Sequence, residues 1–146
     1  MMSTMAKVLY LRQLDLFREM SGEELSTIAH IVTEESLAKG HVLFRQDEPG
    51  DALYLIVSGQ VEVVKSVHGE DKVVAILGPP ECVGEMAILG DQPRTATIQG
   101  MEPCRLLKIA RGEFRALIMA RPEMAFVLFR VLVQRMVEMT EQMKKV

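Results

Sequence analysis

The spacing of hydrophobic residues changes twice along the chain, from the period of a helix to that of strands and back again. In the first part, apolar residues recur at helical spacing between positions 25 and 32. Ser21 and Glu24 precede them in the arrangement of a capping box, where each side chain bonds the other residue's backbone amide. These patterns predict a short helix over 7–14 and a second helix that begins at Ser21.

After position 33 the period becomes two, which is typical of strands. The predicted strands are 34–38, 42–45, 53–58, 60–67, 72–77, 95–101 and 105–109. Segments rich in glycine, proline and aspartate separate them. Many short strands at close spacing favour a sandwich or barrel. We therefore expect a mainly β fold with flanking helices, in the form of a jelly roll (a double-stranded β-helix).

From Arg111 the helical period returns, and Pro122 fits the first turn of a last helix that runs to about Lys145. Two apolar stripes follow this helix. The first stripe, called the seam below, has heptad spacing and consists of Phe129, Leu132, Met136, Met139, Met143 and Val146. The second consists of Val127 and Val131, with Val133 and Val137 as further members, and could face the β-core. Since a helix needs one stripe for its own core, the seam predicts a homodimer. The alternative is that it packs on its own domain.

Composition narrows the classes of protein. A length of 146 residues predicts a single domain over 1–146, with its core over about 8–145 and no DNA-binding domain. A net charge of −3 argues against a general nucleic-acid binder. No apolar run is long enough for a membrane span, and no secretory signal is evident. Cys82 and Cys104 do not form a disulfide framework, so we expect free thiols and a cytoplasmic protein.

Residues for metal binding and catalysis are not grouped in the sequence. His30, His41 and His68 lie far apart, unlike the histidine and glutamate cluster of a metal-binding jelly roll. No nucleophile has an evident base beside it. We therefore expect no enzyme, no metal and no cofactor, and a metal-dependent jelly-roll enzyme is the rival to be tested.

The segment 83–97 carries the clearest chemistry. A glycine and about one helical turn beginning at Glu85 can present free backbone amides to an anion. Arg94 offers a planar fork of donors suited to phosphate, and Thr95 adds a hydroxyl. Glu85, nine positions before Arg94, can accept a hydrogen bond from a sugar hydroxyl. These features suggest a nucleotide as the ligand. The alternative is that Glu85 and Arg94 pair with each other.

The order of these residues, G-E-M-A-I-x₅-R-T-A-T, resembles the phosphate-binding cassette of cyclic nucleotide-binding domains. That family includes the regulatory subunits of protein kinase A, the bacterial catabolite activator protein and cyclic-nucleotide-gated channels. Residues 50–63 look like the family's second signature, and residues 14–25 look like its opening helices. The lead-in to the cassette departs from the family pattern, because Pro80-Glu81-Cys82 stands where glycine and an aromatic residue are common.

The resemblance implies a role for each matching residue. Glu85 would bind the ribose 2′-hydroxyl, and Arg94 would bind the equatorial oxygens of the cyclic phosphate. The remaining implied contacts are Gly84, the backbone amides of Met86, Ala87, Thr95 and Ala96, the packing residues Val63 and Val74, and the lid residues Met136, Met139 and Thr140. Thr95 is permissive for cGMP and does not decide against cAMP.

The expected function is a sensor domain that binds cAMP or cGMP, with cAMP preferred, and couples binding to movement of the last helix. The alternative is a ligand-blind relative used for dimerisation or docking.

Overall fold

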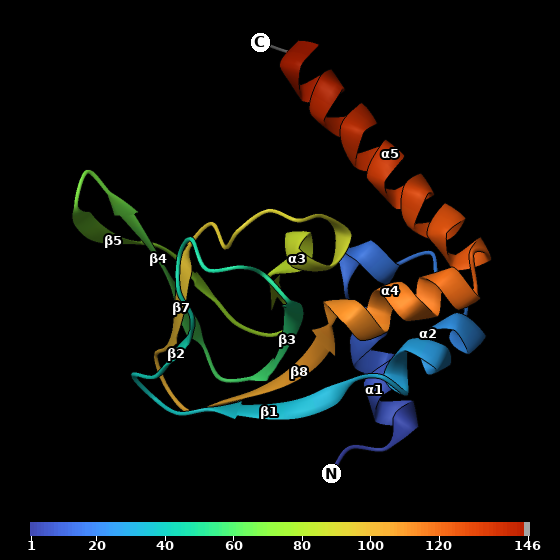
Figure 1. The fold of residues 1–146 in the computed structure, drawn as a ribbon, viewed down its shortest axis with the longest axis horizontal. Helices are drawn as coiled ribbons and strands as arrows, with labels where there is room; N and C mark the ends of the chain where they lie inside the picture. The colour runs from blue at the N-terminus through green and yellow to red at the C-terminus, as the bar shows by residue number, and fades with distance from the viewer. Residues whose placement is uncertain (145–146) are drawn as a thin grey trace. The chain divides into compact units, whose positions relative to one another are not determined.

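The computed structural model describes residues 1–144 and divides into two units. The β unit comprises residues 31–115 together with Met1, and the helical unit comprises residues 2–30 and the chain from 116 onward. Figure 1 shows both. Lys145 and Val146, where the last helix and the seam were expected to end, lie outside the described residues. The single-domain boundary of the chain stays a prediction.

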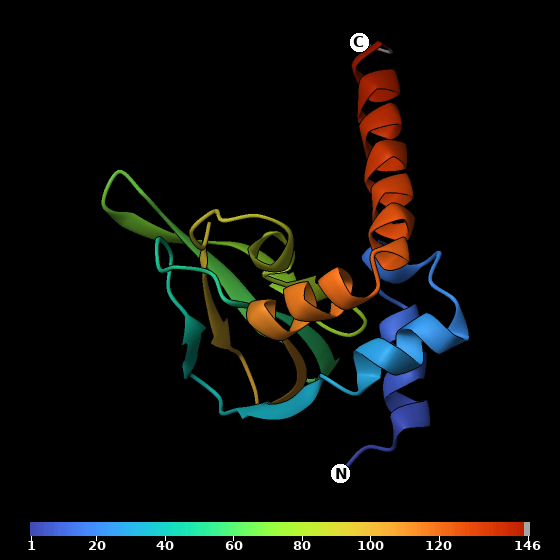
Figure 2. The ribbon, with the colours of Figure 1, turned by 45° about the vertical axis from the view of Figure 1, so that its right-hand side comes forward.

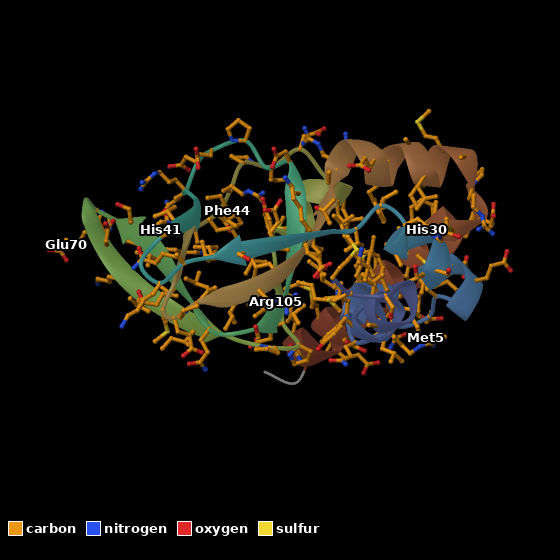
Figure 3. All side chains as sticks on the ribbon, turned by 90° about the horizontal axis from the view of Figure 1, so that it is seen from below. Met5, His30, His41, Phe44, Glu70 and Arg105 are labelled. Carbon is orange, nitrogen blue, oxygen red and sulfur yellow. The ribbon has the colours of Figure 1, made fainter. Side chains whose placement is uncertain are left out.

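Residues 31–115 form two antiparallel sheets of four strands each. The strands are β1 (Thr33–Leu37), β2 (Val42–Phe44), β3 (Ala52–Ser58), β4 (Val61–Val67), β5 (Glu70–Leu77), β6 (Cys82–Val83), β7 (Thr97–Gly100) and β8 (Cys104–Ala110). One sheet has the order β1-β8-β3-β6, and the other has the order β2-β7-β4-β5. The β4–β5 hairpin extends past its neighbouring strands in Figures 1 and 2. Glu70 lies at its tip, as Figure 3 shows. The mainly β fold with flanking helices is confirmed.

Every strand expected from the period of two is present. The expectation missed β6, because two residues are too short to show an alternating pattern. This strand pairs with β3, Tyr54 opposite Val83 and Leu55 opposite Cys82. β6 therefore fixes the backbone directly before the segment that carries the predicted chemistry.

The core of the β unit lies between its sheets. Its buried members are Leu37, Ala52, Tyr54, Ile56, Val61, Val83, Ile98, Cys104 and Leu106. Phe44, Val63 and Leu77 are partly buried and pack against this cluster. Leu53 and Leu55 are also buried, so β3 is covered on both faces. Burying these apolar side chains removes their surface from water and supplies the main stabilisation of the unit.

The second helix and the last two helices begin near their predicted starts, whereas the first helix begins at Thr4 and ends at Arg12 rather than covering the predicted 7–14. They are α1 (Thr4–Arg12), the 3₁₀ turn η1 (Asp15–Phe17), α2 (Gly22–Ala29), α4 (Arg111–Ala120) and α5 (Glu123–Lys144). The capping box before α2 is confirmed. The Ser21 amide donates to Glu24 Oε1 at 2.9 Å, and the Glu24 amide donates to Ser21 Oγ at 3.1 Å. α4 spans the boundary between the two units.

Within the helical unit, the first part of α5 packs against η1. The buried residues of α5 are Met124, Val127, Leu128 and Val131. Arg135 donates to Asp15 Oδ2 through Nε at 2.9 Å and NH2 at 2.8 Å. The expectation that Val133 and Val137 belong to a core-facing stripe is wrong, because 57% and 45% of their surfaces are exposed. One buried stripe, ending at Val131, is enough to hold the helix on η1.

The seam of α5 is largely exposed. Phe129, Met136, Met139 and Met143 are each more than half exposed, and Leu132 is half-buried. No helix within residues 1–144 has the length and apolarity that a bilayer crossing requires.

Candidate functional site

The predicted site begins at the turn between β6 and α3 (Glu85–Leu89), inside the β unit. Gly84 caps this short helix with a φ of 82°, in the left-handed region that favours glycine. A Cβ atom at Gly84 would collide with the Arg94 guanidinium and with the Ala52 carbonyl oxygen. Glycine is therefore required twice, for the backbone conformation and for the close approach of the arginine.

The backbone of Arg94 is fixed by the loop between β2 and β3. The Arg94 amide donates to the Glu48 carbonyl at 2.8 Å, and the Arg94 carbonyl accepts from the Asp47 amide at 2.8 Å. Pro93, just before it, forms a β-bridge with Pro49. Two segments that are far apart in sequence thus set the direction in which the Arg94 side chain leaves the backbone.

The side chain of Arg94 is buried, with 5% of the residue exposed, and among residues 1–144 it is the one buried charged side chain. Its guanidinium lies over the Phe44 ring, with Cζ 3.8 Å from the ring centroid. NH2 forms an ion pair with Asp51 Oδ1 at 3.5 Å, and that carboxylate is itself largely exposed. Burial lowers the pKa of Arg94, and the charge of Asp51 opposes this change.

Two nitrogen atoms of Arg94 have unused hydrogen-bonding capacity. Nε and NH1 are buried and donate no hydrogen bond to any of residues 1–144. A buried donor without an acceptor costs about 1–3 kcal/mol, and more when it carries charge. Natural proteins rarely leave such groups unpaired. An anion at this position would supply the missing acceptors.

Arg94 contributes to the wall of a cavity of about 250 Å³ in the β unit. Eight of the residues implied by the family resemblance line it, namely Val63, Gly84, Glu85, Met86, Ala87, Arg94, Thr95 and Ala96. Figure 3 labels Phe44, which also lines it. The structure thus brings the cassette and Val63 of β4 together around one hollow.

Val74 is not among the residues that line this cavity, contrary to the expected contact with ribose or base. The pairing of β4 with β5 shifts register between Val63 and Val64, which pair with Ala75 and Val73. Val74 is the extra residue at this bulge, and 52% of its surface is exposed. An ungapped reading of the alternation does not locate a bulge.

Sequence reasoning assigned no ligand contact to several of the lining residues, among them Phe44, Leu77 and Cys82. Phe44 lies on a strand of three residues and is half-buried, so its position in the sequence resembles that of any core aromatic. Leu77 ends β5, where the alternating pattern gives way to Gly78. Cys82 was noticed as a departure from the family pattern, and this was the available signal.

The backbone amides of α3 do not all remain available to an anion. The Ala87 amide donates to the Gly84 carbonyl at 2.9 Å, so its expected role in the anion site is not formed in this structure. The Met86 amide lies in the first turn of α3, where backbone amides have no acceptor within the helix. Thr95 is exposed at the cavity, and Ala96 is buried beside it.

Glu85 is half-buried at the first position of α3. Its Oε2 accepts from the Cys82 thiol, with Sγ 3.7 Å away. The ion pair that Arg94 makes is with Asp51. Glu85 and Arg94 thus line the same cavity, and Glu85 contacts Cys82 whereas Arg94 contacts Asp51.

The expected lid residues lie on α5, in the helical unit. Met136, Met139 and Thr140 are exposed, and the Thr140 hydroxyl donates to the Met136 carbonyl at 2.9 Å. Their role as a lid stays a prediction. No cluster of three metal-ligating side chains occurs within the described part of the chain, residues 1–144.

Residues 34–121 match the profile of the family described as the cyclic nucleotide-binding domain. This match covers more than half of the chain and contains both the cassette and the cavity. The chain therefore belongs to the cyclic nucleotide-binding domain family.

Similar proteins include regulators and a kinase. A CRP-like cAMP-activated global transcriptional regulator of Mycobacterium tuberculosis is 34% identical over 79% of this chain and 53% of its own length. A cGMP-dependent protein kinase of Caenorhabditis briggsae is 35% identical over 75% of this chain and 15% of its own length. The chain thus spans about half of the first relative and a small part of the second.

A solved structure with the same fold is the N-terminal domain of a transcriptional regulator from Streptomyces coelicolor. It superposes with a TM-score of 0.84 at 30% identity, over 92% of this chain and 94% of that one. The jelly-roll fold expected from the sequence is confirmed.

Proposed function

We propose that this chain is a sensor domain that binds a cyclic mononucleotide in the cavity of the β unit, with cAMP as the preferred ligand. One observation carries the proposal. Arg94 is buried, and two of its nitrogen atoms donate to none of residues 1–144. A cyclic phosphate offers acceptor oxygens to such a fork, and a buried charge-assisted contact is stronger than a neutral one.

The neighbours of Arg94 fit the rest of such a ligand. Glu85 carries the carboxylate that accepts from the ribose 2′-hydroxyl, since a carboxylate binds a hydroxyl and repels a phosphate. Val63 and Leu77 offer apolar surface to the ribose or the base. The cavity therefore combines one cation, one acid and an apolar wall, as recognition of a cyclic nucleotide requires.

The preference for cAMP rests on the cAMP-activated mycobacterial regulator, which is 34% identical to this chain over 79% of this chain's length. The resemblance to a cGMP-dependent kinase keeps cGMP as the second ligand to be tested. The Thr95 hydroxyl is exposed at the cavity, where it can hydrogen-bond the exocyclic amine of a guanine base. Thr95 thus makes the site permissive for both nucleotides. No cofactor is needed for this function.

The proposed output is a change in the position of α5. A ligand shifts such an equilibrium only by its different affinities for the two positions. In this proposal Met136, Met139 and Thr140 contact the bound base as a lid, and the exposed seam of α5 forms a homodimer with a second copy. The effector that reads this change is a separate partner or domain.

Calorimetric titration of the ligand-stripped protein tests the proposal. We expect cAMP to bind with a Kd of about 1 µM or tighter, cGMP to bind more weakly, and 5′-AMP, which lacks the cyclic phosphate, to give no measurable binding. Absence of heat with either cyclic nucleotide at tens of micromolar protein would favour the ligand-blind alternative. Metal analysis of the same sample tests the jelly-roll enzyme, which requires stoichiometric metal.

A further inference from the structure

The stretch that leads into α3 is the part of the site that the proposed function leaves without a role. Its turn is closed by Glu81, whose amide donates to the Gly78 carbonyl at 2.9 Å and whose Oε1 accepts from the Gly78 amide at 3.1 Å. β6 follows at once, with Cys82 paired to Leu55 of β3. The turn at Glu81 and the pairing with β3 thus fix the backbone of Cys82, which the lining residues Val83 and Gly84 follow.

The side chain of Cys82 reaches over the turn to Glu85. Cys82 is half-buried and lines the same cavity as Glu85 and Arg94. Its thiol donates to Glu85 Oε2, with a sulfur–oxygen distance of 3.7 Å. A thiol is a weak donor, and a carboxylate has about four acceptor sites. The contact can therefore restrain the carboxylate while leaving it capacity to accept a ligand's hydroxyl.

The restraint matters because Glu85 has a long, flexible side chain. Fixing such a side chain on binding costs conformational entropy, about 1–2 kcal/mol for the longest side chains. A neighbour that limits its rotamers beforehand lowers this cost, which is the principle of preorganisation. Cys104, the other thiol, has no such role, because it donates to the backbone carbonyls of Gln60 and Glu102 and does not line the cavity.

We propose that Cys82 is a positioning residue whose thiol orients the Glu85 carboxylate toward the ribose 2′-hydroxyl of the bound nucleotide. This inference rests on the proposed function and adds a determinant of affinity for the sugar. It predicts an effect limited to ligands that carry the 2′-hydroxyl.

The test measures cAMP and 2′-deoxy-cAMP binding by calorimetry to the full chain. Cys82→Val removes the donor and keeps an apolar side chain of similar size, whereas Cys82→Ser keeps a donor. Cys104→Ser is the matched control at the thiol outside the cavity. We expect Cys82→Val to weaken cAMP by about threefold to tenfold, as for one lost hydrogen bond, and 2′-deoxy-cAMP by less than about twofold. Cys82→Ser should restore most of the preference for cAMP over the deoxy analogue.

The outcomes separate this inference from the function on which it rests. If Cys82→Val weakens both ligands equally, Cys82 only shapes the wall, and the positioning role is overturned. Unchanged cAMP binding in Cys82→Val overturns it as well. If the unsubstituted chain binds none of cAMP, cGMP and 2′-deoxy-cAMP, the proposed function itself fails, and the positioning role fails with it. Thermal unfolding of each variant without ligand shows whether a change in binding reflects a change in stability.

Discussion

Replacing Arg94 with methionine should strongly weaken nucleotide binding without destabilising the ligand-free protein. Methionine is apolar, of similar length and flexible enough to fill the space over the Phe44 ring. The guanidinium is desolvated, and its Nε and NH1 donate to none of residues 1–144. An arginine kept in this state is expected to serve a ligand rather than the stability of the fold.

The structure gives the magnitude of both effects. Removing one partner of a buried charged contact costs about 2–5 kcal/mol, so Arg94→Met should weaken cAMP binding by about 30-fold or more. In the ligand-free protein the substitution removes unpaired donors, and the burial of each such donor costs about 1–3 kcal/mol of stability. It also removes a cation–π contact with Phe44 worth about 1–2 kcal/mol and a 3.5 Å ion pair with exposed Asp51 worth less than about 1 kcal/mol. The free energy of unfolding should stay level or rise by about 1–2 kcal/mol.

Urea unfolding without ligand and calorimetry with cAMP measure the two quantities on the same samples. Arg94→Lys is the matched control, because it keeps the positive charge and loses the planar fork. We expect it to bind cAMP more tightly than Arg94→Met and more weakly than the unsubstituted protein. A fall of more than about 2 kcal/mol in the unfolding free energy of Arg94→Met would show that Arg94 stabilises the fold. Binding of cAMP equal to that of the unsubstituted protein would show that Arg94 does not bind the phosphate.

Three further predictions concern the turn, the helical unit and the seam. Gly84→Ala should destabilise the protein by about 1–3 kcal/mol and weaken cAMP binding, because φ at this position is 82° and Arg94 leaves no room for a methyl group. Gly112→Ala within α4 is the control and should stabilise the protein by about 0.5–1 kcal/mol. Urea unfolding measures both changes. The hydrogen bond from Arg135 holds the pKa of Asp15 below its ordinary value of 3.8, so its stabilisation is present at neutral pH and is lost as the pH falls through the folded-state pKa. Asp15→Asn should therefore lower the unfolding free energy by about 0.5–1 kcal/mol near pH 7, and the difference should shrink as the pH falls below 3.8 through the folded-state pKa; a difference that is the same at every pH contradicts this. The unsubstituted chain should sediment as a dimer and Met139→Glu, at a seam residue that is 64% exposed, as a monomer; a sedimentation coefficient that the substitution does not change excludes the seam as the dimer contact.

The predictions from sequence succeeded where the signal is local. The capping box of Ser21 and Glu24 needs only residues three positions apart, and the structure contains both of its hydrogen bonds. β7 alternates between half-buried and buried residues, with Ile98 and Gly100 buried, so its period is visible without knowledge of its partners. Gly84, Glu85 and Arg94 likewise lie within one short segment of the sequence, and the three residues line one cavity.

The features that were missed depend on pairing between distant segments. Val74 does not line the cavity, because the register of β4 and β5 shifts by one residue at this point. One extra residue in a strand turns the side chain to the other face of the sheet. β6 exists because β3 offers it an edge at Leu55. Phe44 lies beneath Arg94 because the loop at Asp47 and Glu48 ties the two segments together. None of these contacts has a period or motif of its own.

A crystal structure of the protein with bound cAMP would show whether the cavity of the β unit is the nucleotide site. We expect the cyclic phosphate within about 3 Å of the Arg94 guanidinium, and the ribose 2′-hydroxyl at a similar distance from the Glu85 carboxylate. A nucleotide bound outside this cavity, or bound there with its phosphate away from Arg94, would show that Arg94 is not the phosphate-binding residue.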